Sequence, residues 1–392
     1  MAGGRVHEVL ISGAGVAGLA AAVALRSAGH RVRVYERSLD PSGDAGTAFN
    51  LWGNAMTALD RLGVGAAVRA AGDPLHRMRL LSHGGELIAE NPIGEIGQRL
   101  GTESVNLRRA ELMRLLREAA DKAGAELRFG QAGRTCRTEG DRVVLGLADG
   151  SEVHGDVLVG ADGARSTLRT QLTSDGGPQE SSLPVRGISD VDPGAPANTV
   201  LMVWGPRGGG AGCWPLAGGQ VSWTVGTTTA LRRRMRRETD LKRLLLDFVA
   251  GFPEPIEAVI AATPAERMVV TPVLVHRDLS WGGGRVLLVG DAAHAMPTVY
   301  SQGACQALED AVVLGEALTD TDDVLAGLAD FRRRRTPRME WLRGRVQSLD
   351  RMQKFENRLM CGIRDRMAGK APPERSERSW RQIMDFGHVP QG

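Results

Sequence analysis

The sequence predicts an α/β fold in which a nucleotide-binding domain is interleaved with a mostly antiparallel β-sheet domain and followed by a helical C-terminus. The chain begins with a strand, a glycine-rich turn, a helix and a second strand. The segment 183–275 changes to a series of strand-like runs, and a buried-strand pattern returns at 285–290. The 392 residues are too many for one ordinary core, so we expect two or three domains.

The first elements form a β-α-β unit of about 30 residues. Residues 6–12 alternate as a strand does, and 16–28 place apolar residues at helical spacing. Gly29 ends this helix, and RVRVYE (31–36) is the second strand.

The elements that follow are shorter. We expect a helix at 54–71, a hairpin of 77–82 with 86–91, and a helix at 109–123. Two strand-like runs flank Asp149-Gly150, which predicts another hairpin.

One helix, 237–250, interrupts the strand-rich segment 183–275. After RVLLVG (285–290), the residues 303–368 are predicted to be helical. The resulting domains are discontinuous. We assign 1–75, 105–180 and 278–340 to the nucleotide-binding domain, 76–104 and 181–277 to the sheet domain, and 341–392 to a C-terminal helical segment.

Composition excludes several classes of function. The net charge of +3 and the two arginine runs, 232–237 and 332–335, do not predict nucleic-acid binding, because no aromatic residues interleave with the arginines; we interpret the runs as solvated helix faces. The four cysteines are scattered and the histidines lack ligand spacing, so we expect reduced thiols and no metal.

No stretch reaches the ~20 apolar residues that a membrane span needs. The apolar segment 9–25 is interrupted by glycines, unlike a signal peptide. We therefore expect a cytoplasmic protein, monomeric or homodimeric, that acts on a small molecule.

The first motif is G-A-G-V-A-G, between the first strand and the first helix. Gly13 permits the tight turn, Gly15 lets the backbone approach a pyrophosphate, and Gly18 lets helix and strand pack closely. Glu36 ends the next strand, where it can accept from ribose hydroxyls, and Arg37 can lie along an adenine. This context predicts a Rossmann-like dinucleotide site; the alternative is a tight turn without a ligand.

The second motif is LVGADGARSTLR (158–169). A strand ends on Gly160, Asp162-Gly163 makes a turn, and a helix begins near Ser166. Asp162 is either a ligand contact or an ordinary helix-capping residue, and the residues alone leave both open.

The third motif is GDAAHAMPTVYSQGACQALEDA (290–311). Asp291 follows a buried strand, where ligands collect in doubly wound sheets, and its carboxylate can hold a polyol hydroxyl. The helix that begins near Gly303 directs its N-terminus into the gap, which favours negative charge there. The alternative is that Asp291 only caps a helix.

Together, in this order, the three motifs resemble the flavoprotein monooxygenases of the para-hydroxybenzoate hydroxylase family, the single-component aromatic hydroxylases, over residues about 6 to 340. The resemblance implies FAD as the cofactor and NAD(P)H as the reductant, and the single G-x-G-x-x-G fits a family without a separate NAD(P)H domain. The FAD contacts that it implies are Gly13, Gly15, Ala17, Gly18, Glu36, Arg37, Arg109 (in R-A-E-L, 109–112), Asp162, Asp291, Pro297, Gln302, Gly303 and Ala304.

The implied chemistry is the reduction of FAD by NAD(P)H, addition of O₂ at flavin C4a, and transfer of one oxygen from the hydroperoxide to an electron-rich aromatic or polyketide-like substrate. Such a reaction serves natural-product tailoring or aromatic breakdown. Alternatives are an epoxidase or Baeyer–Villiger enzyme, a reductase or dehydrogenase without oxygen transfer, and an inactive FAD-binding protein. No residue stands out as a general base, so the catalytic residues stay unassigned.

The chain departs from the family pattern at the flavin loop. Pro297 falls one place early, Thr298 takes the usual proline position, Tyr300 is bulky, and Ser301 replaces the first glycine of G-Q-G. The segment 38–56 has no arginine, which leaves the path of NAD(P)H open.

The substrate pocket is predicted between the flavin and the 183–275 sheet. Each candidate wall residue is equally a candidate core residue. The candidates are Phe49, Met202, Trp204, Trp214, Trp223 and Tyr300.

Overall fold

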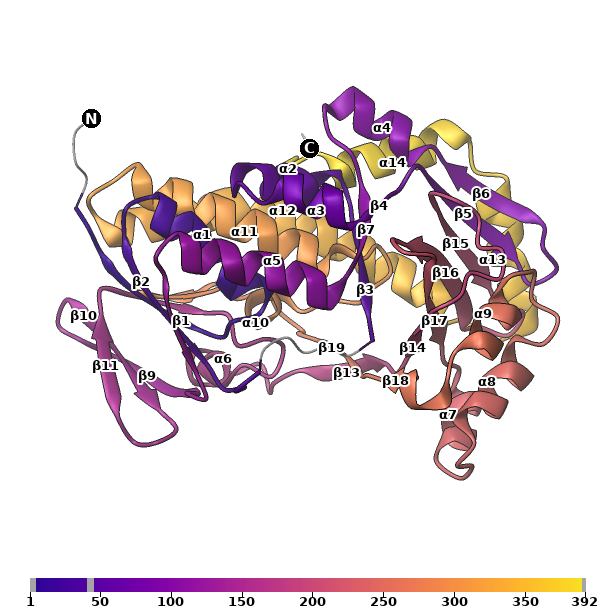
Figure 1. Ribbon diagram of the computed structural model, residues 1–392, viewed down its shortest axis with the longest axis horizontal. Helices are drawn as coiled ribbons and strands as arrows, with labels where there is room; N and C mark the ends of the chain where they lie inside the picture. The colour runs from indigo at the N-terminus through magenta and orange to yellow at the C-terminus, as the bar shows by residue number, and fades with distance from the viewer. Residues whose placement is uncertain (1–4, 41–45, 390–392) are drawn as a thin grey trace.

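A six-stranded sheet forms the core of one half of the molecule (Figure 1). The computed structural model describes residues 5–40 and 46–389, so part of the 38–56 segment and both chain ends lie outside it. The strands β21, β12, β1, β2 and β8 are parallel neighbours in this order, and β20 adds an antiparallel edge. Their bounds are β1 (Glu8–Ser12), β2 (Arg31–Glu36), β8 (Glu126–Phe129), β12 (Val157–Gly160), β20 (Gly282–Gly283) and β21 (Val286–Leu288).

Helices α1 (Val16–Ser27), α5 (Arg109–Lys122) and α11 (Gln302–Thr319) lie together above this sheet in Figure 1. A Cβ atom on Gly315 would lie 3.0 Å from the Cβ atom of Ala24, so small residues let α11 approach α1 closely. Below the sheet lies a small antiparallel sheet of β9 (Gly133–Glu139), β10 (Arg142–Leu147) and β11 (Glu152–Gly155).

A seven-stranded sheet forms the other half, in the order β18-β14-β17-β16-β15-β5-β6. Its pairs are antiparallel except for β15 with β5. The strands are β5 (Arg77–Ser82), β6 (Leu87–Asn91), β14 (Val185–Ser189), β15 (Thr199–Trp204), β16 (Gly210–Leu216), β17 (Gln220–Gly226) and β18 (Val269–Val270). One face packs on α9 (Ile256–Ala262), which contacts α8 (Leu241–Val249), and these elements bury a second hydrophobic core.

Short elements connect the halves. β3 (Ala48–Leu51), β7 (Val105–Arg108) and β4 (Asp73–Pro74) form a three-stranded sheet, and β13 (Gln179–Ser182) pairs with β19 (Val273–Val275). The short helices are α2 (Gly53–Arg61), α3 (Gly65–Ala71), α4 (Ile93–Leu100), α6 (Thr167–Leu172), α7 (Thr229–Met235) and α10 (Asp291–His294).

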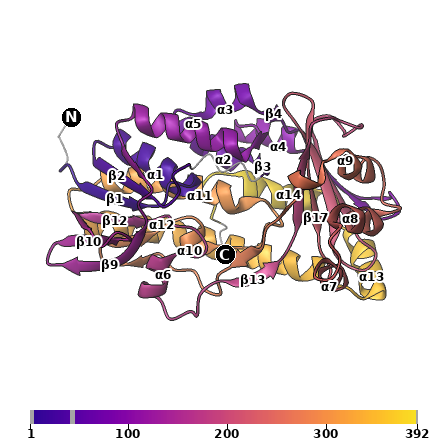
Figure 2. The ribbon, with the colours of Figure 1, turned by 60° about the horizontal axis from the view of Figure 1, so that its bottom comes forward.

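Three C-terminal helices run from one half to the other (Figures 1 and 2). α12 (Val324–Gln353) packs on α11, α13 (Arg358–Gly369) on β6, and α14 (Pro373–Met384) on α4, β6 and α2. The C-terminal segment therefore contacts both sheets or their covering helices.

The α/β class, the interleaved antiparallel sheet and the helical C-terminus are confirmed. Two predicted helices are wrong in detail. The helix at 54–71 is divided into α2 and α3 at Gly63, whose φ of 72° interrupts a helix. The helix predicted at 237–250 is α8, which begins only after its capping residue Asp240, and two further helices, α7 and α9, lie before and after it.

The proposed domain boundaries stay a prediction, and α12 runs continuously across residues 340 and 341. In the described ranges, none of the helices combines the length and apolar character needed to cross a membrane.

Candidate active site

A cavity of about 1740 Å³ lies between the two halves. Its walls come from the turn after β1, the start of α5, the β12–α6 turn, the α10–α11 loop, the seven-stranded sheet and the C-terminal helices. Figure 2 shows α10 and α11 between the two sheets. The three sequence motifs, which are far apart in the chain, therefore meet at one cavity.

The glycine-rich turn forms a cradle at one end of this cavity. Gly13 has a φ of 105°, and a Cβ atom there would lie 2.4 Å from the Ala161 carbonyl oxygen. A Cβ atom on Gly18 would lie 1.9 Å from the Gly13 carbonyl oxygen, so both positions need glycine. Gly15 has open space within 4 Å, and the uncapped start of α1, including Ala17, faces the cavity. Free backbone N–H groups beside open space fit the pyrophosphate of a dinucleotide.

Glu36 shapes this cradle without lining the cavity. Its two carboxylate oxygens accept hydrogen bonds from the backbone N–H groups of Ala14 and Ser38, at 2.8 and 2.9 Å. Arg37 next to it is exposed and lines the cavity. The carboxylate thus holds the glycine turn against the end of β2.

Asp162 has the helix-capping role that its sequence context offered, and one of its oxygens stays available for a ligand. One carboxylate oxygen accepts from the Thr167 backbone N–H at 3.0 Å at the start of α6. The other oxygen is buried and has no hydrogen-bond partner among the described residues, and the residue lines the cavity. Burial raises the pKa of this carboxyl group. A buried oxygen without a partner fits a donor from a bound ligand.

Arg169 holds the third motif in place through hydrogen bonds to its backbone, a role that its position in the sequence did not predict. The side chain is 1% exposed and pairs with Asp175. It donates to the carbonyl oxygens of Ala292 and Ala293 at 3.1 and 2.8 Å. The second motif therefore fixes α10, at the start of which Asp291 lies.

Asp291 faces the cavity at the point where α10 and α11 meet. A Cβ atom on Gly303 would lie 3.7 Å from its Oδ1 atom. Although the carboxylate contacts the open cavity, protein surrounds it, and this burial raises its pKa, while His294 and Arg109 act in the opposite direction. Arg109, at the start of α5, lies 5.8 Å from the centre of the Phe49 ring, and burial lowers its own pKa. A carboxylate and a guanidinium group beside the N-terminus of α11 offer hydrogen-bond partners to a ligand that carries several hydroxyl groups.

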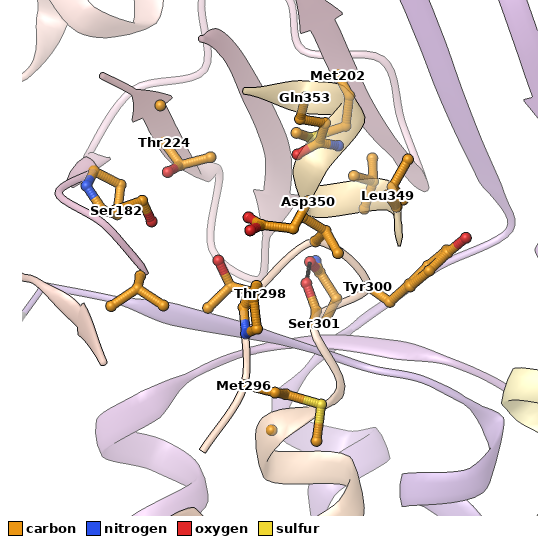
Figure 3. A pocket seen from close by; sticks show the side chains of 18 of the residues that line it. Ser182, Met202, Thr224, Met296, Thr298, Tyr300, Ser301, Leu349, Asp350 and Gln353 are labelled. Atoms are coloured by element: carbon orange, nitrogen blue, oxygen red, sulfur yellow. Dashed lines mark hydrogen bonds between the residues drawn. The ribbon is translucent and has the colours of Figure 1, made fainter. Parts of the chain in front are cut away.

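The loop before α11 is anchored by residues on the β3–α2 side. Ser301 has a φ of 52°, in the left-handed region that favours glycine, and its hydroxyl donates to Asn50 Oδ1 at 3.2 Å. The Trp52 indole N–H donates to the Tyr300 carbonyl oxygen at 2.9 Å. Thr298 is exposed to the cavity (Figure 3). The departures from the family pattern therefore form one continuous wall of the cavity.

Pro297, Gly303 and Ala304 line the cavity as well. Gln302 does not, because its side chain is buried and accepts hydrogen bonds from Asn54 and Gln306 at 3.0 and 2.9 Å. Gln302 therefore stabilises the start of α11 on the side of the helix that faces away from the cavity.

The seven-stranded sheet supplies the opposite wall. Strand pairing places Met202, Gly212, Thr224 and Arg186 in one row on the same face. The Met202 sulfur covers Gly212, where a Cβ atom would lie 2.3 Å from it. The row ends at Arg186, which has no hydrogen bond or ion pair with the residues that the structure describes. Burial lowers its pKa.

Five of the six predicted wall residues line the cavity, and Trp223 does not. Trp214 pairs with Ser222 across the sheet, so the adjacent Trp223 must point to the other face. There it is 2% exposed and donates to Thr263 Oγ1 at 2.8 Å in the second core. The predicted residues that line the cavity are Phe49, Met202, Trp204 and Trp214, together with Tyr300 of the loop.

The C-terminal helices contribute cavity residues that the sequence did not identify. Leu349, Asp350 and Gln353 at the end of α12 line the cavity, and in Figure 3 Asp350 points toward Thr298 of the loop. Trp380 of α14 packs against Trp52 and Tyr300, with ring centres 4.6 and 5.5 Å apart. No motif marks these residues, because only helix packing brings them to the site.

A buried charge cluster lies under α11. Arg335 donates to Glu309 and Asp310 at 2.7 and 2.8 Å, and His294 lies 2.7 Å from Asp310. All four side chains are at most 2% exposed. The interpretation of the 332–335 run as a solvated face is therefore wrong for Arg335.

The chain is similar to several characterised enzymes. It is 32% identical to the aurachin C monooxygenase/isomerase of Stigmatella aurantiaca, over 96% of this chain and 98% of that protein. It is 32% identical to 3-hydroxybenzoate 6-hydroxylase 1 of Aquipseudomonas alcaligenes, over 88% of each chain. The crystal structure of Klebsiella pneumoniae HpxO complexed with FAD and uric acid superposes with a TM-score of 0.84 at 26% identity, over 96% of each chain.

The FAD binding domain family matches residues 6–338, which include all three motifs. This match and the relatives confirm the resemblance on which the cofactor prediction depends. The chain therefore belongs to the FAD binding domain family and is an FAD-dependent monooxygenase of the para-hydroxybenzoate hydroxylase type.

Proposed function

We propose that this enzyme uses NAD(P)H and O₂ to hydroxylate an aromatic or polyketide-like small molecule, in natural-product tailoring or in aromatic breakdown. The observation that carries the proposal is the single cavity of about 1740 Å³, which joins the glycine cradle to a largely apolar chamber at the sheet. A cavity of this size has room for a dinucleotide and a second small molecule.

The cradle at Gly15 and the start of α1 would hold the pyrophosphate of FAD. Asp291 would bind the ribityl hydroxyls, with Arg109 nearby. The start of α11, at Gly303 and Ala304, would direct backbone N–H groups at the negatively charged edge of the flavin ring. When bound, FAD supplies the electron transfer from NAD(P)H and the activation of O₂.

The chamber beyond the flavin loop would position the substrate and exclude water. Met202, Trp204, Trp214 and Leu349 give this part of the cavity apolar walls. Such walls lower the local dielectric and hold a planar ring in a limited range of orientations. The relatives support a small organic substrate, since their names refer to aurachin C and 3-hydroxybenzoate.

The test is product formation by the purified, FAD-loaded enzyme with a panel of aromatic and polyketide-like compounds. We expect substrate-stimulated NAD(P)H oxidation and one ¹⁸O atom from ¹⁸O₂ in the product. Product formation without oxygen would contradict the proposal and favour a reductase or dehydrogenase. An ¹⁸O label in an epoxide or ester would identify the epoxidase or Baeyer–Villiger alternative.

A further inference from the structure

Five acidic residues line the cavity, and four of them have their partners outside the proposed substrate chamber or a role assigned above. Glu90 pairs with Arg79, and Glu356 accepts from the backbone and hydroxyl of Thr229. Asp162 caps α6, and Asp291 is assigned to the ribityl chain. The fifth is Asp350, which neither the motifs nor the proposed FAD contacts use.

Asp350 lies in the last turn of α12 and has one free oxygen. Its Oδ2 atom accepts from Lys354 Nζ at 2.6 Å, and the same ammonium donates to Ser181 Oγ at 2.7 Å. The Oδ1 atom has no hydrogen bond with any described residue. The side chain is 16% exposed. In Figure 3 the carboxylate points into the cavity, toward Thr298 of the flavin loop.

Helix stability accounts for the Oδ2 atom, which forms an i,i+4 pair with Lys354, but not for the Oδ1 atom. A negative charge in the last turn of a helix is unfavourable, because the helix dipole places partial negative charge there. Lys354 compensates part of this effect, and its second bond to Ser181 fixes the ammonium on the side of Oδ2. The arrangement leaves Oδ1 directed at the space where the substrate would bind.

We propose that Asp350 Oδ1 accepts a hydrogen bond from an O–H or N–H group on the ring of the substrate. This inference rests on the proposed function and names the substrate class: neutral aromatic compounds with a hydrogen-bond donor on the ring. A hydrogen bond to a charged acceptor is typically worth roughly 10-fold to 100-fold in affinity. A substrate carboxylate at this position would be repelled.

The probes are 2-naphthol and 2-methoxynaphthalene, which share the ring and differ in that a methyl group replaces the hydroxyl proton. Their dissociation constants for the FAD-loaded enzyme are measured from the change in flavin absorbance. We expect the wild-type enzyme to bind 2-naphthol at least about tenfold more tightly than the ether. Asp350→Ala should remove this preference while the affinity for the ether and the flavin content stay unchanged, and Asp350→Asn, which keeps an acceptor oxygen, should retain part of it.

The matched control is Glu340→Gln, which removes a carboxylate from an exposed position of the same helix. It should keep the full preference. An equal affinity of the wild-type enzyme for the two probes, or a preference that persists in Asp350→Ala, overturns the assignment. Binding is measured without turnover. A failure of oxygen transfer would therefore contradict the proposed function but would not change the measured role of Asp350.

Discussion

At the scale of single residues, the site depends on side chains whose ionisation is shifted by their surroundings. Burial raises the pKa of Asp291, and Arg109 and His294 oppose this shift. Burial, with Arg169 nearby, lowers the pKa of His276 to about 4. His276 precedes the site in the chain, and its backbone N–H donates to the Ala295 carbonyl oxygen at 2.9 Å. Both groups therefore lie next to α10, at its start and at its end.

We predict that Asp291→Ala weakens FAD binding by about tenfold or more, because hydrogen bonds between the carboxylate and ligand hydroxyls are lost. The ratio of flavin to protein absorbance after purification measures this. Asp121→Ala, at an exposed position of α5, is the control. A purified Asp291→Ala protein with full flavin content would show that the carboxylate does not bind the cofactor.

A second prediction concerns acid stability. The pKa of His276 is lower in the folded state than the ~6.5 of an unfolded chain, so the unfolded state binds the proton first. The free energy of unfolding should then fall by up to about 3 kcal/mol as the pH decreases from 6.5 to 4, and be unaffected by this group above 6.5. Urea unfolding at several pH values should give a flatter profile for His276→Leu. An identical slope in the two proteins would contradict the prediction.

At the scale of elements, α11 connects the flavin loop to the buried charge cluster that it shares with α12. Burial opposes ionisation of Glu309 and Asp310, but the nearby cations outweigh it, so both pKa values lie below their usual range. Arg338 extends the contact by donating to the Gln382 and Ile383 carbonyl oxygens of α14, each at 2.8 Å. The cluster thus joins α10, α11, α12 and, through Arg338, α14.

Arg335→Met should destabilise the protein by about 3–5 kcal/mol, because it removes the cation that the buried carboxylates of Glu309 and Asp310 share and leaves them only Arg338 and His294 as ion-pair partners. Arg334→Met, one residue earlier, removes a partly exposed pair with Glu316 and should cost less than about 1 kcal/mol. Urea unfolding monitored by circular dichroism compares the two variants. Equal losses would mean that the buried cluster contributes no more than a surface ion pair.

At the scale of the whole molecule, the C-terminal segment closes a cavity that two separate sheets begin. Trp380 of α14 is 4% exposed and contacts both Trp52 and the flavin loop at Tyr300. On the other side, Ser376 donates to Asn91 Oδ1 of the seven-stranded sheet at 2.6 Å. One helix therefore holds both halves at a fixed separation around the site.

We expect Trp380→Ala to lower the free energy of unfolding by about 3–5 kcal/mol and to admit water beside the flavin loop. Released hydrogen peroxide per NAD(P)H oxidised should rise, which a peroxidase-coupled assay detects. Trp380→Phe, which keeps an aromatic ring, should stay close to the wild type in both measurements. Unchanged peroxide release in Trp380→Ala would argue that α14 does not seal the cavity.

The sequence by itself determined the features that depend on local backbone and short spacing. Gly13 is required by its positive φ and Gly18 by its contact with the Gly13 carbonyl, both within one turn, and the start of α11 follows from its own residues, so these could be predicted, whereas the contact of Gly13 with Ala161 is tertiary. Ser301 was recognised as a departure, and its left-handed φ explains why glycine is usual there. The tertiary structure alone decided which side chains face the cavity. Trp214 and Trp223 look alike in sequence, and only the strand register puts them on opposite faces. Asp350 and Trp380 reach the site because α12 and α14 dock across both sheets, and such long-range packing leaves no periodic or spaced pattern in the chain.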